Sequence, residues 1–278
     1  MGAESSLRQK SGFSNVDEVD DGAGWFKLYL EKINRVPAIR RYKQYELELI
    51  NPQMGEHILD VGCGLGLGLQ AIRSFNSEVG RLVGIDNSQS MVSQAIASTS
   101  RDLISSGKFS FLQEDAHNLA FRDEIFDVTY ADRTFQHLSN PKQAFEEMLR
   151  VTKKDGRIII ADTDWTTLQL KGISGETAEK IKRAYLRIIV NPLMGSELQG
   201  LFTEHGLKDL TVIEVPLDMP NFRTLDTVLA LKPSLELAGN GGFLSGEDVD
   251  QVLEDVRQAR KSIQASVSIY IAKGKKQK

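Results

Sequence analysis

Apolar runs of strand length alternate with helix-like amphipathic stretches through the middle of the chain. The first run, Ile58-Leu59, ends at an acid and a glycine turn, and the residues after the turn have helical periodicity. The pattern repeats with short turns, which predicts a doubly wound α/β fold around a parallel sheet. The later strands of this series are predicted at residues 81–86, 108–115, 124–132 and 157–165.

The two ends of the chain have a different pattern. Residues 24–50 have helical periodicity interrupted at Pro37, which predicts two helices, the second starting near Ala38. We therefore expect residues 1–50 to form a helical lid or cap on a domain spanning residues 51–278, with pocket-forming insertions at about 166–205 and 217–264. Two more strands are predicted at 207–217 and 265–274, and helices at 69–75, 88–105, 176–190, 196–204, 222–238 and 246–264.

Four glycines at alternate positions, from Gly62 to Gly68, follow the first strand. Glycine is needed where the backbone adopts unusual φ angles or approaches a ligand, and a helix N-terminus suits a carboxylate or phosphate. The stretch therefore predicts a ligand-binding loop. The dinucleotide fingerprint G-x-G-x-x-G/A fits only when counted from Gly66 to Ala71, several residues past the strand end.

Acids or aromatic residues end each later strand, and these ends meet in the ligand crevice of such sheets. Asp86 lies at the distance from the glycines at which an acid accepts hydrogen bonds from ribose hydroxyls, which several cofactors contain. Asp115 and the backbone of Ala116 suit adenine, and Met91 can pack against it. Asp132-Arg133 and Asp164-Trp165 end the fourth and fifth strands at the same edge.

Composition and charge narrow the functional classes. The chain has 278 residues, 41% hydrophobic and 26% charged, with a net charge of −4, which argues against a general nucleic-acid surface. One cysteine, Cys63, excludes an intramolecular disulfide and a thiolate cluster, and the scattered histidines predict no metal site. No apolar run is long enough for a membrane span, and the polar N-terminus is unlike a signal peptide, so a cytoplasmic location is expected. Residues 1–6 fit the N-myristoylation template at Gly2, but chance explains so short a match better.

Six short motifs occur in an order and spacing typical of one family. Together they resemble the class I S-adenosylmethionine-dependent methyltransferases that include the ubiquinone and menaquinone biosynthesis C-methyltransferases. The resemblance covers roughly residues 55–165 and implies a seven-stranded sheet of order 3-2-1-4-5-7-6 with the last strand antiparallel. The motifs are Asp60-Val61-Gly62-Cys63-Gly64, Gly84-Ile85-Asp86-Asn87-Ser88, Gln113-Glu114-Asp115-Ala116, Phe126-Asp127-Val128, Gln136-His137-Leu138 and Arg150-Val151.

The resemblance also implies roles for individual residues. The Asp132-Arg133 pair would lie near the methionine amino group and the methyl donor, where the family usually has a small or apolar pair. Two charges there favour either an internal ion pair or a contact with a polar substrate. The remaining cofactor contacts would be Asp60, Gly62 and Gly64 for the methionine part, Asp86 for the ribose, and Met91, Asp115 and Ala116 for the adenine, with Asn87 as a further contact.

We therefore predict methyl transfer from S-adenosylmethionine to a small-molecule acceptor, by in-line displacement at oxygen, carbon or nitrogen. His137, just past the fourth strand, is the candidate general base, because an ordinary histidine pKa suits proton transfer, although it equally suits structural packing. Asp132 is the second candidate catalytic residue. The candidate substrate contacts are Tyr29, Arg133, Asp164 and Trp165. Two alternatives stay open: a nicotinamide-dependent oxidoreductase, and a non-methylating protein that holds the same cofactor.

Overall fold

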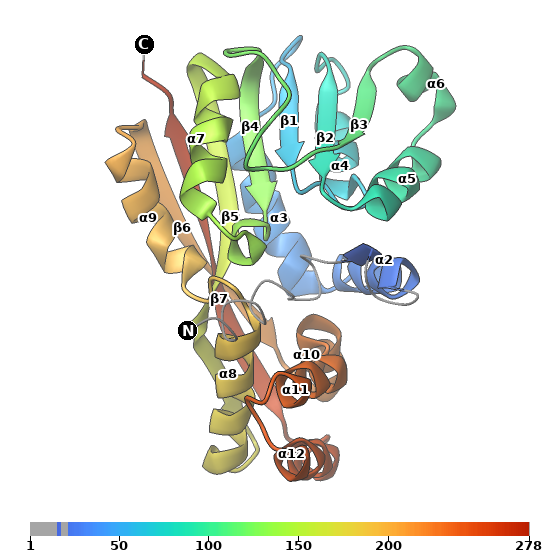
Figure 1. Ribbon diagram of the computed structural model, residues 1–278, viewed down its shortest axis with the longest axis vertical. Helices are drawn as coiled ribbons and strands as arrows, with labels where there is room; N and C mark the ends of the chain where they lie inside the picture. Colours follow the sequence, from blue (N-terminus) through green and yellow to red (C-terminus); the bar gives the residue numbers. More distant parts are fainter. Residues whose placement is uncertain (1–15, 18–21, 278) are drawn as a thin grey trace.

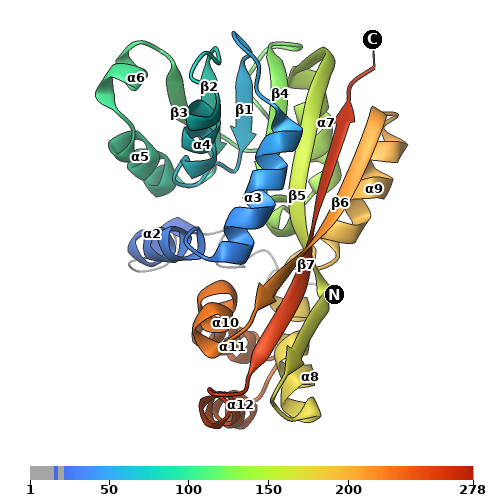
Figure 2. The same ribbon diagram turned by 180° about the vertical axis from the view of Figure 1, so that it is seen from behind.

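Within the residues that the computed structural model describes, 16–17 and 22–277, seven strands form one twisted sheet with helices on both faces (Figures 1 and 2). The strands lie in the order β3-β2-β1-β4-β5-β7-β6. They are β1 (Ile58–Val61), β2 (Leu82–Asp86), β3 (Phe109–Gln113), β4 (Phe126–Asp132), β5 (Thr152–Lys171), β6 (Lys208–Met219) and β7 (Gln264–Lys275).

The helices pack against the sheet in two layers. Helices α7 and α9 lie on one face, and α3 and α4 lie on the other. The helices are α2 (Gly22–Ile33), α3 (Pro37–Ile50), α4 (Leu67–Phe75), α5 (Gln89–Ser98), α6 (Arg101–Ser105), α7 (Pro141–Val151), α8 (Gly175–Ile188), α9 (Met194–Glu204), α10 (Phe222–Leu229), α11 (Leu231–Asn240) and α12 (Gly246–Gln258), with a 3₁₀ helix at Phe135–His137.

The sheet topology confirms the predicted fold class. Strands β1 to β5 pair in parallel, whereas β7 runs antiparallel to both β5 and β6. The central strand β1 is buried along its whole length, as expected of a parallel strand covered on both faces. Successive side chains of this strand enter opposite layers: Ile58 joins the apolar cluster beneath α3 and α4, and Leu59 joins the cluster beneath α7.

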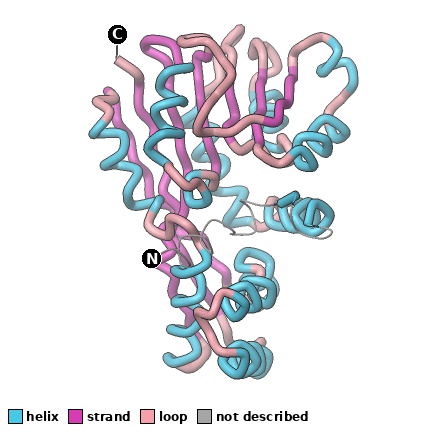
Figure 3. The backbone as a smooth tube through the Cα atoms, viewed as in Figure 1, coloured by secondary structure: helices cyan, strands magenta, loops and turns pink. Residues whose placement is uncertain are grey.

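Strand β5 is much longer than predicted. It spans 20 residues and pairs with β7 as far as Lys171, with a shift in register between Asp164 and Gln169. The strand predicted to end at residue 165 therefore continues to Lys171, and the first helix after it, α8, begins at Gly175. The extended ends of β5, β6 and β7 form a narrow ribbon beside α8, α10, α11 and α12 (Figures 1 and 3).

Two predicted helices are divided in the structure. The helix expected over 88–105 stops at Thr99, whose hydroxyl donates to the carbonyl of Ala95 and whose backbone is extended. Such hydroxyl bonds compete with helical ones. The helix expected over 222–238 is divided into α10 and α11 at Ala230, which has φ 48°. The helix expected to reach residue 264 ends at Gln258.

The N-terminal helices confirm the predicted break at proline. Helix α2 ends at Ile33, and Pro37 is the first residue of α3, where its missing N–H costs no hydrogen bond. Gly2, the predicted myristoylation position, lies outside the described residues. None of the helices in the described part of the chain has the length and hydrophobicity that a membrane span requires.

Two glycines of α9 provide a matched test of its packing. A Cβ on Gly195 would lie 2.7 Å from the carbonyl oxygen of Asp162 and 2.8 Å from the backbone nitrogen of Asp164, whereas a Cβ on Gly200 meets no atom within 4 Å. We expect Gly195→Ala to lower the free energy of unfolding by about 1–3 kcal/mol, because α9 must move away from β5. Gly200→Ala is expected to raise it by up to about 1 kcal/mol through helix propensity. Urea unfolding measures both, and equal effects would contradict this close packing.

Candidate functional site

The glycine loop after β1 has the strained geometry that its sequence predicts. Gly62 and Gly64 have φ angles of 78° and 50°, in the left-handed region that other residues avoid. A Cβ on Gly62 would lie 2.3 Å from the hydroxyl oxygen of Thr134, so the loop touches the end of β4. Gly66 forms the N-cap of α4, and its Cβ position faces Phe111. Gly62 and Gly64 line the cavity described below, whereas Gly66 is not among its lining residues.

Asp86 ties the end of β2 to this loop. Its carboxylate accepts hydrogen bonds from the backbone N–H of Gly64 at 2.9 Å and of Ser88 at 3.0 Å. Burial raises the pKa of the Asp86 carboxyl, and these two N–H donors oppose the rise without cancelling it. The predicted strand-end acid therefore lies against the predicted ligand loop.

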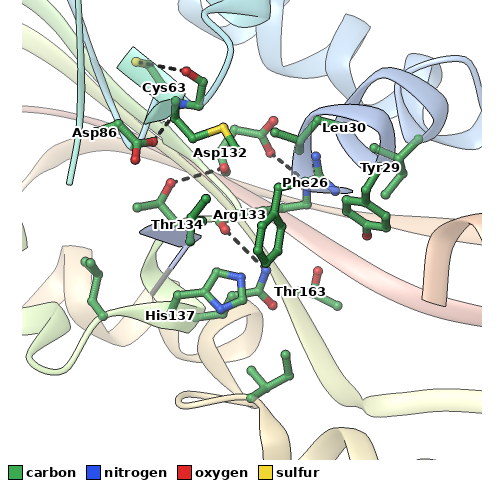
Figure 4. Close-up of a pocket in the computed structure, with 18 of the residues that line it drawn as sticks. Phe26, Tyr29, Leu30, Cys63, Asp86, Asp132, Arg133, Thr134, His137 and Thr163 are labelled. Carbon is green, nitrogen blue, oxygen red and sulfur yellow. Dashed lines mark hydrogen bonds and ion pairs between the residues drawn. The ribbon is translucent and has the colours of Figure 1, made fainter. Parts of the chain in front are cut away.

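A cavity of about 1030 Å³ opens at the carboxyl ends of β1, β2, β4 and β5. Ligand sites typically measure about 300–1,000 Å³, so this cavity has room for a cofactor and a second molecule. Helices α2, α10 and α11 close its other side. It brings together all but one of the predicted site residues: Tyr29, Asp60, Gly62, Gly64, Asp86, Asn87, Met91, Asp115, Ala116, Asp132, Arg133, His137 and Trp165. Figure 4 shows Tyr29, Asp86, Asp132, Arg133 and His137 among them.

Asp164 is the exception: it is not among the residues that line the cavity, and its role in substrate binding stays a prediction. Its Oδ1 accepts hydrogen bonds from the backbone N–H and the hydroxyl of Thr166, at 2.9 and 2.5 Å. Successive strand residues point to opposite faces, so Thr163 and Trp165 line the cavity and Asp164 does not. Its carboxylate stabilises the local turn of β5.

Asp132 forms the centre of a buried charged cluster. Its carboxylate accepts a hydrogen bond from the Tyr42 hydroxyl at 3.0 Å and forms an ion pair with Lys43, both from α3. The Arg133 Nε lies 3.6 Å from Oδ1 of Asp132. Burial alone would raise the pKa of Asp132, but the charges of Lys43 and Arg133 hold it below its usual range. Of the two predicted roles for the pair, the internal ion pair is present.

Two further acids lie buried beside this cluster. Tyr130 donates to Oδ2 of Asp60 at 2.5 Å, and burial raises the pKa of Asp60 to about 7. Burial and the charge of Asp132 raise the pKa of Glu46, on α3, well above its usual range. Its Oε1 is a buried atom without a hydrogen-bond partner among the described residues. The prediction included neither Lys43 nor Glu46, although the buried face Ile39, Tyr42, Glu46 and Ile50 follows helical spacing.

His137 lies at the cavity in the 3₁₀ helix after β4. Burial and the nearby charge of Arg133 lower the pKa of its imidazole to about 3. The expectation that its pKa suits proton transfer is therefore wrong, since so weak a base takes up a proton poorly near neutral pH. Its catalytic role stays a prediction.

Aromatic side chains form the far part of the cavity. The indole N–H of Trp165 donates to the side-chain oxygen of Gln136 at 2.7 Å, and its ring stacks on Tyr185 of α8 with centroids 4.9 Å apart. The Tyr29 hydroxyl donates to the carbonyl of Val228 at 3.0 Å, which joins α2 to α10. The sequence did not single out Tyr185, and it placed Gln136 in a family motif without a role, because the partners of both side chains are distant in the chain.

Metal and thiol chemistry find no support in the described part of the chain. No group of three or more His, Cys, Asp or Glu side chains there has the geometry to hold a metal ion. Cys63 is buried, and burial raises the pKa of its thiol well above the usual range, which keeps it protonated and unreactive.

Comparison with known proteins gives consistent matches. A family model described as a methyltransferase domain matches residues 52–206. An O-methyltransferase from Aspergillus sclerotiorum is 29% identical over 194 residues, 69% of this chain and 69% of that protein. A demethylmenaquinone methyltransferase from Shouchella clausii is 24% identical over 208 residues, 67% of this chain and 86% of that protein. The YcgJ protein from Bacillus subtilis shares the fold, with a TM-score of 0.60 and 19% identity over 86% of this chain and 99% of that chain.

The buried Asp60 carboxyl gives stability a defined pH dependence. Its pKa of about 7 in the folded protein exceeds the value near 4 of an unfolded chain, so its stabilising contribution is present at low pH and is lost as the pH rises from about 4 to about 7. Asp60→Asn has no such loss. We expect the unfolding free energy of the variant, relative to the parent protein, to rise over this range by an amount on the order of 3 kcal/mol. Urea unfolding from pH 5 to 8 tests this, and a pH-independent difference would contradict it.

Proposed function

Because the chain belongs to the class I S-adenosylmethionine-dependent methyltransferase family, we propose that it methylates a small-molecule acceptor bound in the cavity beside the cofactor. The observation that supports this most directly is the arrangement of the cavity. One part is formed by the glycine loop and Asp86, and the continuous remainder is apolar and aromatic, around Trp165 and Tyr185. The two parts fit a polar cofactor and an apolar organic acceptor.

The residues of the first part fit S-adenosylmethionine. Each carboxylate oxygen of Asp86 accepts one backbone N–H and keeps a lone pair for a ribose hydroxyl. Oδ1 of Asp115 accepts from the backbone and ring of His117, which leaves Oδ2 for the adenine amine. Asp132, held in its ionised form, suits the ammonium of the methionine part. Asn87, Met91 and Ala116 complete the proposed contacts.

When bound, S-adenosylmethionine supplies a methyl group on a positively charged sulfur. We propose that the protein holds the acceptor in line with that methyl group and excludes water from the site. Trp165, fixed by Gln136 and stacked on Tyr185, gives the acceptor a rigid flat wall. The O-methyltransferase name of one relative favours an acceptor with a hydroxyl group. A cytoplasmic site of action stays a prediction.

We also propose that residues 1–50 act as a lid, as their sequence predicted. Within the described part of this segment, Val16 is buried with Phe26 and with Leu65 and Met91 beside the glycine loop. Asp17 accepts hydrogen bonds from the backbone N–H of Gln89 at 2.8 Å and from the Ser88 hydroxyl at 2.7 Å. An acid at the start of α5 stabilises the helix N-terminus and holds this segment next to Asp86.

The cofactor assignment is tested by calorimetric titration with S-adenosylhomocysteine, with NAD as comparator. We expect the first to bind and the second not to bind. Asp86→Ala is expected to weaken S-adenosylhomocysteine binding at least about tenfold, because two charged hydrogen bonds to the ribose are lost. Asp250→Ala, at an exposed position of α12, is the control and should bind normally. NAD binding alone would favour an oxidoreductase instead.

Transfer of a labelled methyl group separates an enzyme from a protein that only holds the cofactor. A panel of phenols, enols and amines is incubated with labelled S-adenosylmethionine, and product formation is followed. Label in any organic product supports the proposal. Tight cofactor binding with no transfer to any member of the panel favours the non-methylating alternative.

Loss of the Asp17 contacts tests the lid. We expect Asp17→Ala to increase the dissociation rate of S-adenosylhomocysteine about 3- to 10-fold, the effect of losing a helix cap worth about 1 kcal/mol. Asp102→Ala removes an acid from the first turn of the neighbouring helix α6 and is the matched control. Stopped-flow displacement measures both rates. Equal rates in Asp17→Ala and the control would refute a lid held at this point.

A further inference from the structure

Arg133 has a strained backbone conformation at the wall of the cavity. It follows the last residue of β4, and its φ angle of 52° is in the left-handed region, which costs a non-glycine residue free energy. Its backbone N–H donates to the carbonyl of Ala161 at 2.7 Å, which fixes the turn. Strain of this kind persists where the surroundings over-determine it, as they do at binding sites.

The guanidinium of Arg133 lies inside the cavity, beside Asp132 and near Phe26 and Tyr29 of α2 (Figure 4). Its central carbon is 6.0 Å from the ring centre of Tyr42. The Nε atom is buried and makes no hydrogen bond to any described residue, although Asp132 lies 3.6 Å away. A buried donor without an acceptor calls for an explanation, and at the wall of a ligand cavity a ligand atom can supply the missing acceptor.

Charge around Arg133 is unbalanced in favour of the cation. Tyr42 and Lys43 already contact the carboxylate of Asp132, so that acid does not form a paired fork with the guanidinium. Burial and the charge of Asp132 raise the pKa of Glu46, which opposes its ionisation. Burial raises the pKa of Asp162 to about 7, and both of its oxygens accept backbone N–H groups. Lys43 and Arg133 therefore lie beside the one carboxylate of this group whose pKa is lowered, and the sulfonium of the cofactor would add another positive charge.

The position of Arg133 joins the two parts of the cavity. The next residue, Thr134, lies against Gly62 of the cofactor loop. Gln136, three residues after Arg133, bonds Trp165 of the aromatic wall, and its own amide donates to the Arg133 carbonyl at 3.3 Å. A group bound by the guanidinium therefore lies where the methyl donor and the acceptor meet.

We infer that Arg133 binds an ionised oxygen of the acceptor, so that the substrate class is acidic: a phenol, enol or carboxylic acid attached to an apolar ring system. The inference rests on the proposed function. The acceptor loses its proton to solvent as it binds, and the oxygen lone pair forms the bond to the methyl carbon. The carbon–sulfur bond breaks, its electron pair stays on sulfur, and the negative and positive charges cancel. No strong base is needed, which agrees with the weak basicity of His137.

A matched pair of probes tests this inference in the protein saturated with S-adenosylhomocysteine. The probes are 2-naphthoate and its neutral analogue 2-naphthamide, chosen because the adjoining wall is aromatic. Calorimetry is expected to give tighter binding of the anion by about 10- to 100-fold, the value of a charged hydrogen-bonded pair. Arg133→Gln should abolish this preference and keep naphthamide binding, and Arg133→Lys should retain part of it. Arg122→Gln, at an exposed position, should behave like the parent protein.

The possible results distinguish a failure of this inference from a failure of the proposed function. Equal binding of the two probes to the parent protein, or a preference that survives in Arg133→Gln, overturns the inference. If Arg133→Gln weakens S-adenosylhomocysteine but not methylthioadenosine, which lacks the amino-acid part, the guanidinium binds the cofactor carboxylate and the inference is likewise wrong. Failure of the parent protein to bind S-adenosylhomocysteine at all overturns the proposed function and the inference with it.

Discussion

The carboxylate of Asp132 is the contact on which the geometry of the site depends. It lies at the end of a central strand, where it accepts a hydrogen bond from Tyr42 and forms an ion pair with Lys43, two consecutive residues of α3. A buried carboxylate needs such partners, because the free energy of burying an unpaired charge is large. The same bonds therefore neutralise the strand end and fix the N-terminal helices against the sheet. The position of the cavity wall follows from this one junction.

Glu46 and Asp60 differ from Asp132 because, among the described residues, neither forms an ion pair, and the nearby charge of Lys43 does not offset their burial. Glu46 and Asp60 lie in the same buried layer, yet burial raises their pKa values, whereas Lys43 and Arg133 lower that of Asp132. One acid is thereby kept ionised while its neighbours bind protons more readily. The difference in pKa follows from the position of the two cations, which lie at the strand end where the methyl donor and the acceptor are proposed to meet.

The sequence predicted the parts of the molecule that are encoded locally. The glycine loop after β1 and the acid at the end of β2 follow from short local patterns, whereas the order of the strands was implied by the family resemblance. The ion pair between Lys43 and Asp132 joins residues 89 positions apart in the chain, so no local sequence pattern predicts it. The sequence grouped Asp164 with Trp165, although strand alternation places only Trp165 at the cavity, because the register of β5 relative to the cavity was unknown. The length of β5 depends on pairing with β7, which a short polar stretch does not reveal.

Some parts of the cavity could be predicted from the sequence and others could not, because the two parts of the cavity are built differently. The cofactor part uses backbone groups, such as the Gly64 N–H that holds Asp86, and these depend on glycine and on short turns. The acceptor part uses side chains from distant elements, such as Trp165 on Tyr185, whose positions depend on packing. Backbone geometry tolerates little substitution, whereas a packed side-chain wall can be rebuilt residue by residue. A fold of this design can keep one methyl donor while its acceptor changes, and Arg133, at the junction, is the residue that we propose selects the acceptor's charge.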